Sequence, residues 1–125
     1  MIASIFFALY SLSLNNVLPP IGNRYYTSIS IPLIGRQNVK YERIKELISE
    51  VSLSGKVNKR GYIYFDNNDL YKYTLDDTLE NIFKKYKCTL SHPYYDNIND
   101  IITLNIKINI IRYSKKLILI NDEYL

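Results

Sequence analysis

The strongest pattern in this sequence is a strict alternation of apolar and polar residues near the C-terminus. The apolar positions are Ile102, Leu104, Ile106, Ile108 and Ile110, and the polar residues between them are Thr103, Asn105, Lys107 and Asn109. Side chains of a β-strand point to opposite faces in turn, so a period of two predicts a long strand with one buried and one solvated face. The fold must therefore contain a sheet whose apolar face packs against other elements.

A shorter alternation predicts a second strand within residues 25–33. Ile29, Ile31 and Leu33 fall on one face of this strand, and small polar residues precede them on the other. Because proline has no N–H to donate, the strand ends at Pro32 or lies at the edge of its sheet. Residues 112–116 predict a turn that leads into a last strand at 117–120.

Two segments have the spacing of amphipathic helices. The first carries apolar residues at i, i+3, i+4 and i+7, with charged residues facing away and Gly55 as its end. Its apolar residues are Ile44, Leu47, Ile48 and Val51, and its charged residues are Glu42, Arg43, Lys45, Glu46 and Glu50. The second begins with Asp77 and Glu80, which have the spacing of a capping pair. Its apolar stripe is Leu79, Ile82, Phe83 and Tyr86, and its basic end is Lys84, Lys85 and Lys87.

Between these helices, two aromatic, β-favouring runs predict a hairpin. The runs are residues 61–65 and 70–75, and the turn between them is Asp66-Asn67-Asn68-Asp69. The expected order is strand, helix, strand, strand, helix, strand, plus a C-terminal strand. This is the order of an α+β, ferredoxin-like split β-α-β sandwich, with a mainly antiparallel sheet and both helices on one face. A β-grasp fold is the alternative, but it leaves the first helix unexplained.

The chain has 125 residues, which is the usual size of one domain. We expect a single α+β domain over residues 25–125, preceded by an apolar extension and linker over residues 1–24. Residues 1–14 (MIASIFFALYSLSL) are fewer than the roughly 20 that a spanning helix needs, and no Lys or Arg precedes Arg24 as a secretory signal would require. We therefore expect this segment to dock on a protein partner, and contact with a membrane is the less favoured alternative.

The composition points to an AT-rich gene. The sequence contains 19 Ile, 13 Asn, 13 Tyr and 11 Lys, whose codons begin with A or T at both of the first two positions, and it contains no Trp. An organelle, a virus, a plasmid or a parasite could be the source. The formal net charge is +4, which mildly favours an anionic partner. The single cysteine, Cys88, excludes an internal disulfide and a thiolate cluster for zinc.

The catalytic inventory is small. Cys88 and His92 are the only thiol and the only imidazole, and no motif supplies the orienting group and oxyanion site that a nucleophilic pair would need. Turn and cap positions account for the acidic residues Asp66, Asp69, Asp76 and Asp77. Four scattered glycines form no phosphate loop. We expect no catalytic residues, no metal and no cofactor.

One stretch has the character of a nucleic-acid platform, because a basic segment runs directly into an aromatic strand. Its candidate binding residues are Lys56, Lys59, Arg60, Tyr62 and Tyr64. The Arg60-Gly61-Tyr62 run resembles the opening of the ribonucleoprotein motif of RNA-recognition domains. Ile63 stands where that motif has Gly or Ala, and Asn67 replaces an aromatic residue. The sequence is therefore not assigned to that family.

A second basic group is expected around the last predicted turn. It comprises Lys107, Arg112, Lys115 and Lys116. If this turn and the Lys59-Arg60 segment lie on the same side of the fold, the two groups form one phosphate-contacting surface.

The expected element order is similar to that of the small-subunit ribosomal protein numbered ten. The first helix of that protein is also followed by a Val-x-Arg-Gly stretch, here residues 57–61 with one residue more. The long loop with a Ser-Pro-His signature is missing, so the similarity is used only as an analogy of fold.

Three functions follow from these observations. The favoured one is a non-catalytic subunit of a ribonucleoprotein that contacts RNA and neighbouring proteins, such as a mitochondrial ribosomal protein in the matrix. A viral or plasmid-encoded accessory protein that binds a host protein or nucleic acid is the first alternative. An accessory subunit of a membrane complex, docked by residues 1–14, is the second, and an enzyme is the least favoured.

Overall fold

The computed structural model describes residues 18–31, 34–70, 72–90 and 94–119. In this part of the chain, nine strands form one antiparallel sheet and a single helix packs against it. The strands are β1 (Arg24–Ile31), β2 (Gly35–Lys45), β3 (Ile48–Gly55), β4 (Lys59–Phe65), β5 (Tyr73–Leu75), β6 (Cys88–Leu90), β7 (Tyr94–Asp96), β8 (Ile101–Ile108) and β9 (Ile111–Leu119), and the helix is α2 (Asp77–Lys85).

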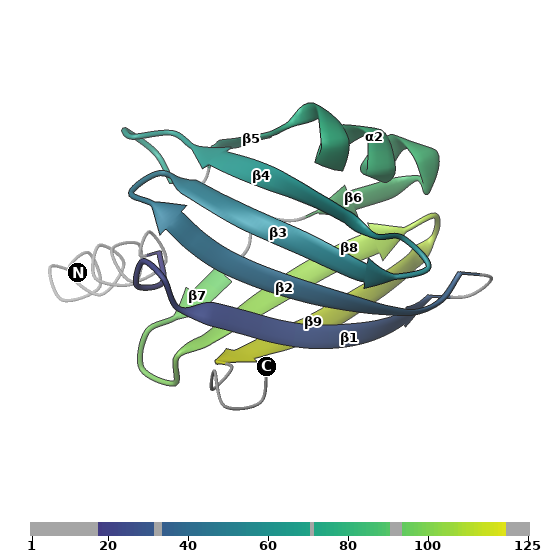
Figure 1. Ribbon diagram of the computed structural model, residues 1–125, viewed down its shortest axis with the longest axis horizontal. Coiled ribbons are helices and arrows are strands. Elements are labelled where there is room, and N and C mark those ends of the chain that lie inside the picture. The colour runs from purple at the N-terminus through teal and green to yellow at the C-terminus, as the bar shows by residue number, and fades with distance from the viewer. Residues whose placement is uncertain (1–17, 32–33, 71, 91–93, 120–125) are drawn as a thin grey trace, which may run out of the picture.

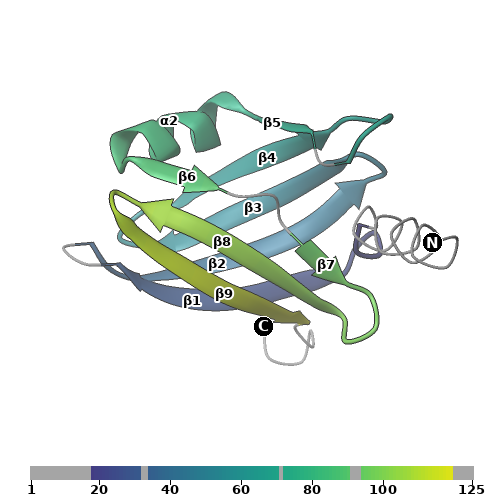
Figure 2. The same cartoon turned by 180° about the vertical axis from the view of Figure 1, so that it is seen from behind.

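The sheet curls on itself into a half-barrel. Its strand order is β5-β4-β3-β2-β1-β9-β8-β6, and β7 pairs with β8 on the same edge as β6. Figures 1 and 2 show β8 and β9 lying across from β2 and β3, with α2 and β6 along the open side of the curl. The sheet therefore has a convex outer face and a concave inner face that encloses the core.

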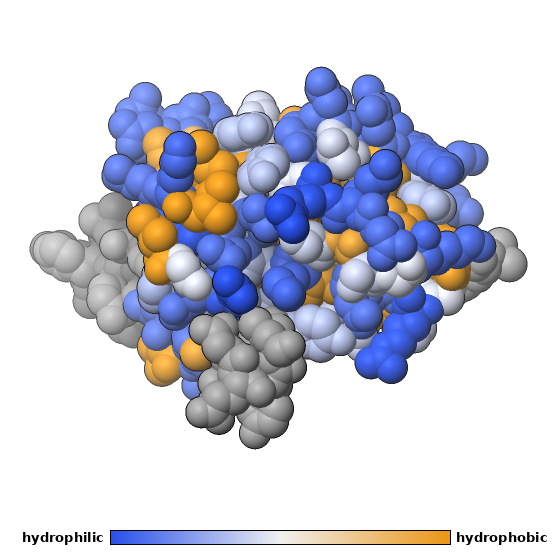
Figure 3. Space-filling model, in the orientation of Figure 1, coloured by the Kyte–Doolittle hydropathy of each residue, from blue (hydrophilic) through white to orange (hydrophobic). Residues whose placement is uncertain are grey.

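The core consists of the inward-facing residues of the alternating strands. Tyr25, Ile63 and Leu117 are at most 1 % exposed, although they come from distant parts of the chain. Their cross-strand neighbours, such as Ile102 opposite Leu117, are also buried, because residues paired across a ladder share a face. The outward-facing residues between them are mostly polar, and Figure 3 shows a largely hydrophilic face that is interrupted by apolar patches.

Helix α2 packs on the inner face where β4 carries a glycine. A Cβ at Gly61 would lie 2.4 Å from Cγ of Leu79, a helix residue that is 1 % exposed. Asp76 caps the helix, since its side chain accepts a hydrogen bond from the backbone N–H of Leu79 at 3.0 Å. The backbone N–H of Asp76 in turn donates to the carbonyl of Tyr62 on β4. The first turn of the helix is thus tied to β4, and the observed cap, Asp76, lies one residue before the predicted capping residue, Asp77.

The ferredoxin-like α+β prediction is wrong, and the predicted first helix is the main cause. Residues 42–51 form the end of β2, a turn and the start of β3 instead of a helix. Arg43 pairs with Ser49 across the β2–β3 ladder, and β3 pairs with β4 on its other side, so a helix there would remove both ladders. Arg43 stabilises the turn by donating from its guanidinium to the carbonyl oxygen of Glu46 at 3.0 and 2.7 Å. Gly55 is a strand end with φ of 136° and caps no helix.

The C-terminal turn is also displaced from its predicted position. Residues 112–116 lie inside β9, and the chain reverses at Asn109 and Ile110 instead. Asn109 adopts a positive φ of 57°, which asparagine tolerates better than most residues. The short strands β6 and β7 were not predicted at all. β1 lies inside the sheet, between β2 and β9, so the alternative that placed it at an edge is wrong as well.

Four predicted elements are confirmed with adjusted ends. They are the strand that ends before Pro32, the hairpin of β4 and β5, the helix that begins at Asp77, and the long strand near the C-terminus, now β8. Residues 1–17 lie outside the described residues, so the predicted docking of the apolar segment stays a prediction. Among the residues described, no helix combines the length and apolar character needed to cross a bilayer.

Candidate functional site

Basic residues gather at one end of the curled sheet, which we call the basic end. The strand directions bring together the β1–β2, β3–β4 and β8–β9 turns and the C-terminal end of α2, on the right of Figure 1. The basic residues at this end are Arg36, Lys56, Lys59, Lys84, Lys85, Lys87, Lys107 and Arg112. Half of the 16 Lys and Arg residues of the chain therefore lie at one end.

Carboxylates are concentrated elsewhere. Within α2, Oε1 of Glu80 in the first turn lies 3.5 Å from Nζ of Lys84 in the last turn and so neutralises one cation. The turns at the opposite end carry five acidic residues: Glu46, Asp66, Asp69, Asp96 and Asp100. These five carboxylates are interleaved with Arg43, Lys45 and Lys72, so the opposite end, which we call the acidic end, is only weakly negative. The excess positive charge of the described residues is therefore concentrated at the basic end, and a segregated charge of this kind orients an anionic partner before contact.

The β3–β4 turn, which carries Lys56 and Lys59, is held by two carboxamides. Gln37, which is buried, donates from Nε2 to the carbonyl of Val57 at 2.6 Å and accepts from the N–H of Val57 at 3.1 Å. Asn58 pairs in the same two-way manner with the backbone of Gly55. Side-chain amides of this kind replace the ladder bonds that a turn lacks. They hold the backbone that carries the two lysines in one conformation.

The first depression at the basic end is the turn–helix cleft, about 400 Å³ in volume, between the β3–β4 turn and α2. Its lining residues are Lys56, Val57, Asn58, Lys59, Thr78, Asn81, Ile82, Lys85 and Tyr86. Three of them are lysines and none is acidic. The ammonium group of Lys85 lies 5.4 Å from the ring centroid of Tyr86, which favours the position of that cation beside the cleft.

The second depression is the strand cleft, about 490 Å³ in volume, on the convex face of β6, β8 and β9. Lys107 and Arg112 are direct cross-strand partners and therefore point the same way, into this cleft. Its other polar lining residues are Thr89, Asn105 and Ser114. This cleft also has two cations, neutral hydrogen-bonding groups and no carboxylate.

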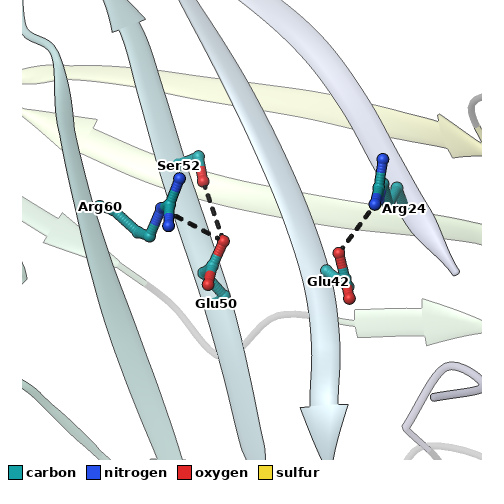
Figure 4. A network of polar contacts seen from close by, with 5 residues as sticks. All are labelled: Arg24, Glu42, Glu50, Ser52 and Arg60. Atoms are coloured by element: carbon teal, nitrogen blue, oxygen red, sulfur yellow. Dashed lines mark hydrogen bonds and ion pairs between the residues drawn. The ribbon is translucent and has the colours of Figure 1, made fainter. Parts of the chain in front are cut away.

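Three of the predicted site residues lie on the convex face of β4. Arg60, Tyr62 and Tyr64 pair across the ladder with Ser52, Glu50 and Ile48, so all three point outward. Figure 4 shows Arg60 beside Glu50, and Nε of Arg60 lies 3.5 Å from Oε1 of Glu50. A second outward pair, Arg24 with Glu42, lies nearby on the same face. Arg60 is therefore partly neutralised, and Tyr64 lies towards the acidic end.

The structure separates Lys115 from Lys116. Lys115 pairs with the buried Leu104 and faces inward, whereas Lys116 pairs with Thr103 and faces outward. The pKa of Asp96 is lowered mainly by a hydrogen bond from Asn99 and to a smaller extent by the positive charge of Lys116. Lys116 therefore lies near Asp96, towards the acidic end. Of the predicted C-terminal group, only Lys107 and Arg112 come together in one cleft.

The basic end contains residues that the sequence reasoning did not select. Lys84, Lys85 and Lys87 were explained by the dipole of α2, and Arg36 had no predicted element around it. Lys87 adopts a positive φ of 52°, and its carbonyl accepts a hydrogen bond from the N–H of Asn109 at 3.0 Å. That bond joins the end of α2 to the β8–β9 turn, which the sequence pattern alone could not reveal.

The groups considered for chemistry lie elsewhere or lack partners. Burial raises the pKa of the Cys88 thiol, which disfavours the thiolate that a nucleophile requires. His92 lies outside the described residues. Within the described ranges, no three His, Cys, Asp or Glu side chains are grouped closely enough to hold a metal ion. Asp66 accepts from the N–H of Asn68, and Asp76 caps α2, as their turn and cap positions predicted.

Comparisons with protein-family models, curated proteins and solved structures find no match to this chain.

Proposed function

We propose that this chain is a non-catalytic protein that binds the phosphate backbone of single-stranded nucleic acid, in particular RNA within a larger assembly, through its basic end. The observation that carries the proposal is the pair of clefts at that end, both lined with cations and neutral donors and neither with a carboxylate. Phosphate contacts from Lys and Arg supply most of the sequence-independent affinity of nucleic-acid-binding proteins.

The arrangement of the clefts favours a flexible strand. The turn–helix cleft is lined by α2, and the strand cleft is lined by Thr89 of β6. Lys87 lies in the junction between these two elements. A backbone that bends around the junction can place phosphates in both clefts, with Lys87 between them. A rigid duplex lacks that freedom, because its persistence length is on the order of 50 nm.

The same geometry predicts weak sequence preference. Tyr86 is the aromatic residue that lines the turn–helix cleft, while Tyr62 and Tyr64 lie on the convex face of β4. Stacking on one or two aromatic rings tolerates any base, and sequence readout needs hydrogen bonds to base edges. The proposed role is therefore to hold a strand in place.

Binding can be measured by fluorescence anisotropy of a labelled RNA of mixed sequence at several salt concentrations. Each phosphate neutralised on a single strand adds about 0.7 to the slope of log affinity against log salt, so contact by five cations gives a slope of about −3.5. Replacing Lys56 and Lys59 by Glu should weaken binding at low salt and reduce the magnitude of the slope. Replacing Lys107 and Arg112 by Glu should do the same.

The matched control is Lys45→Glu with Lys72→Glu, which makes the same change in net charge at exposed lysines near the opposite end. This control should retain most of the affinity. If all three double variants lose affinity equally, binding depends only on net charge and the basic end is not the site. If the unaltered protein shows no salt-dependent binding, the proposed function is wrong.

A further inference from the structure

Two small apolar cavities, both partly open, lie between α2 and the inner face of the sheet. The larger is about 80 Å³ and the smaller about 60 Å³. Val39, Leu53, Phe83 and Ile106 line both, so the two cavities are neighbours. Protein cores are normally filled to crystal-like density, and unfilled apolar space is a site where an apolar ligand can be accommodated.

The larger cavity adjoins the turn–helix cleft. Val57, Ile82 and Tyr86 line both spaces and form the wall between them. All three side chains are only half-buried. Lys56, Lys59 and Lys85 line the cleft on one side of this wall, and apolar residues line the cavity on the other. An apolar chamber thus lies directly behind a positively charged opening.

The helix is attached in a way that leaves this wall adjustable. Its first turn is held against Gly61 by Leu79 and by the cap at Asp76. Ile82 and Tyr86 lie at least three residues beyond Leu79, where the helix covers the unfilled space. Rotamer changes of these two side chains can open the wall without moving the first turn of α2, which Leu79 and Asp76 hold against β4.

We propose that this pair of spaces binds a free, single-chain anionic amphiphile, with its short apolar tail in the cavities and its head group in the turn–helix cleft. Charge complementarity decides the chemistry of the occupant. A carboxylate or sulfate head can reach the ammonium groups of Lys56, Lys59 and Lys85, and a cleft without carboxylates offers nothing to a cationic head. The small size of the cavities limits the tail to a short chain.

Cys88 provides a direct readout, because it lines the larger cavity and is the only cysteine in the chain. The experiment measures the rate at which a neutral thiol reagent modifies Cys88 in the presence of octanoate. Octanoate is expected to slow modification at concentrations where octanol and octylammonium have a much weaker effect. Along the series from butanoate to octanoate, affinity should rise about fourfold per methylene until the cavities are full.

Two sets of variants test the tail and the head separately. Leu53→Phe places a larger side chain between the two cavities and should abolish protection by octanoate, and Val39→Ile, a milder filling, should weaken it. Lys56→Glu with Lys85→Glu should reduce octanoate affinity at least tenfold, whereas Lys45→Glu with Lys72→Glu should leave it unchanged. Circular dichroism of each variant distinguishes loss of the site from loss of the fold.

The proposal is overturned if octanoate fails to protect Cys88, if octanol protects equally well, or if protection requires vesicles of anionic lipid. The head group shares the turn–helix cleft with the proposed RNA site, but the tail site can be tested separately, because Leu53 does not line that cleft. Leu53→Phe should therefore lose octanoate protection and retain RNA binding. Loss of RNA binding in this folded variant would show that the cavity is not a separate site.

Discussion

Replacing Gly61 by Ala should destabilise the protein, although alanine normally stabilises a strand position occupied by glycine. Gly61 does not have a positive φ, so the backbone conformation itself suits alanine. Without a steric conflict, the substitution would stabilise the fold by about 0.4–1 kcal/mol through the unfolded state. The new methyl group, however, would lie 2.4 Å from Cγ of Leu79 and 2.8 Å from Oδ1 of Asp76.

The magnitude follows from these two contacts. Overpacking a filled site costs about 1–3 kcal/mol, and displacing the capping carboxylate costs about 1 kcal/mol more. The expected loss is therefore about 2–4 kcal/mol. With a urea m-value of about 1.5 kcal/mol per M, the unfolding midpoint should fall by about 1.3–2.7 M. Urea titration followed by circular dichroism measures this shift.

A double-mutant cycle with Leu79→Ala tests the stated cause. Leu79→Ala alone should cost about 2–5 kcal/mol, because its side chain is buried. In the double variant the methyl group added by Gly61→Ala enters the vacated space, so the combined loss should be smaller than the sum by at least about 1 kcal/mol. Stabilisation by Gly61→Ala, or simple additivity with Leu79→Ala, would show that α2 is not seated on this glycine.

Three further predictions concern polar groups. Burial raises the pKa of Tyr41 to about 12, so this tyrosine ionises in the unfolded chain before it ionises in the folded protein as the pH rises. The free energy of unfolding should therefore fall between pH 10 and pH 12, by up to about 2–3 kcal/mol. Tyr41→Phe should reduce this pH dependence, measured by urea titrations at each pH. Gln37→Met leaves both backbone groups of Val57 unpaired and should cost about 1–3 kcal/mol, with faster hydrogen exchange at that amide. Arg60→Ala should change stability by less than about 1 kcal/mol, because Arg60 is exposed to solvent. It should also lower RNA affinity less than Lys59→Ala does, because Glu50 already partly neutralises the charge of Arg60.

Several local elements were decided by the sequence itself. The alternation in β8, the turn residues between β4 and β5, and the start of α2 each specify a conformation through interactions within a few residues. β1 likewise ends at Ile31, as the following proline in the sequence predicted, because proline cannot donate to a ladder. These elements are present in the fold with ends shifted by only a few residues.

The segment around residues 42–51 shows where local reasoning fails. Ile44, Leu47, Ile48 and Val51 match one face of a helix, yet the same stretch contains the ends of two alternating strands and a turn. A short apolar run fits both patterns, and only its partners distinguish them. The pairing of β2 with β3, and of β3 with β4, selects the strands.

The candidate site was accessible to sequence reasoning only in part. Lys56, Lys59, Lys107 and Arg112 were selected as basic residues near turns, but their grouping depends on which turns share an end of the sheet. That is set by the pairing of β1 with β9, strands separated by most of the chain, and by the register that turns Lys115 inward. The sequence by itself determined the local strands and the helix, because their signals are contained in neighbouring residues. The tertiary structure decided the charged end, the clefts and the cavities, because these arise only where distant strands meet.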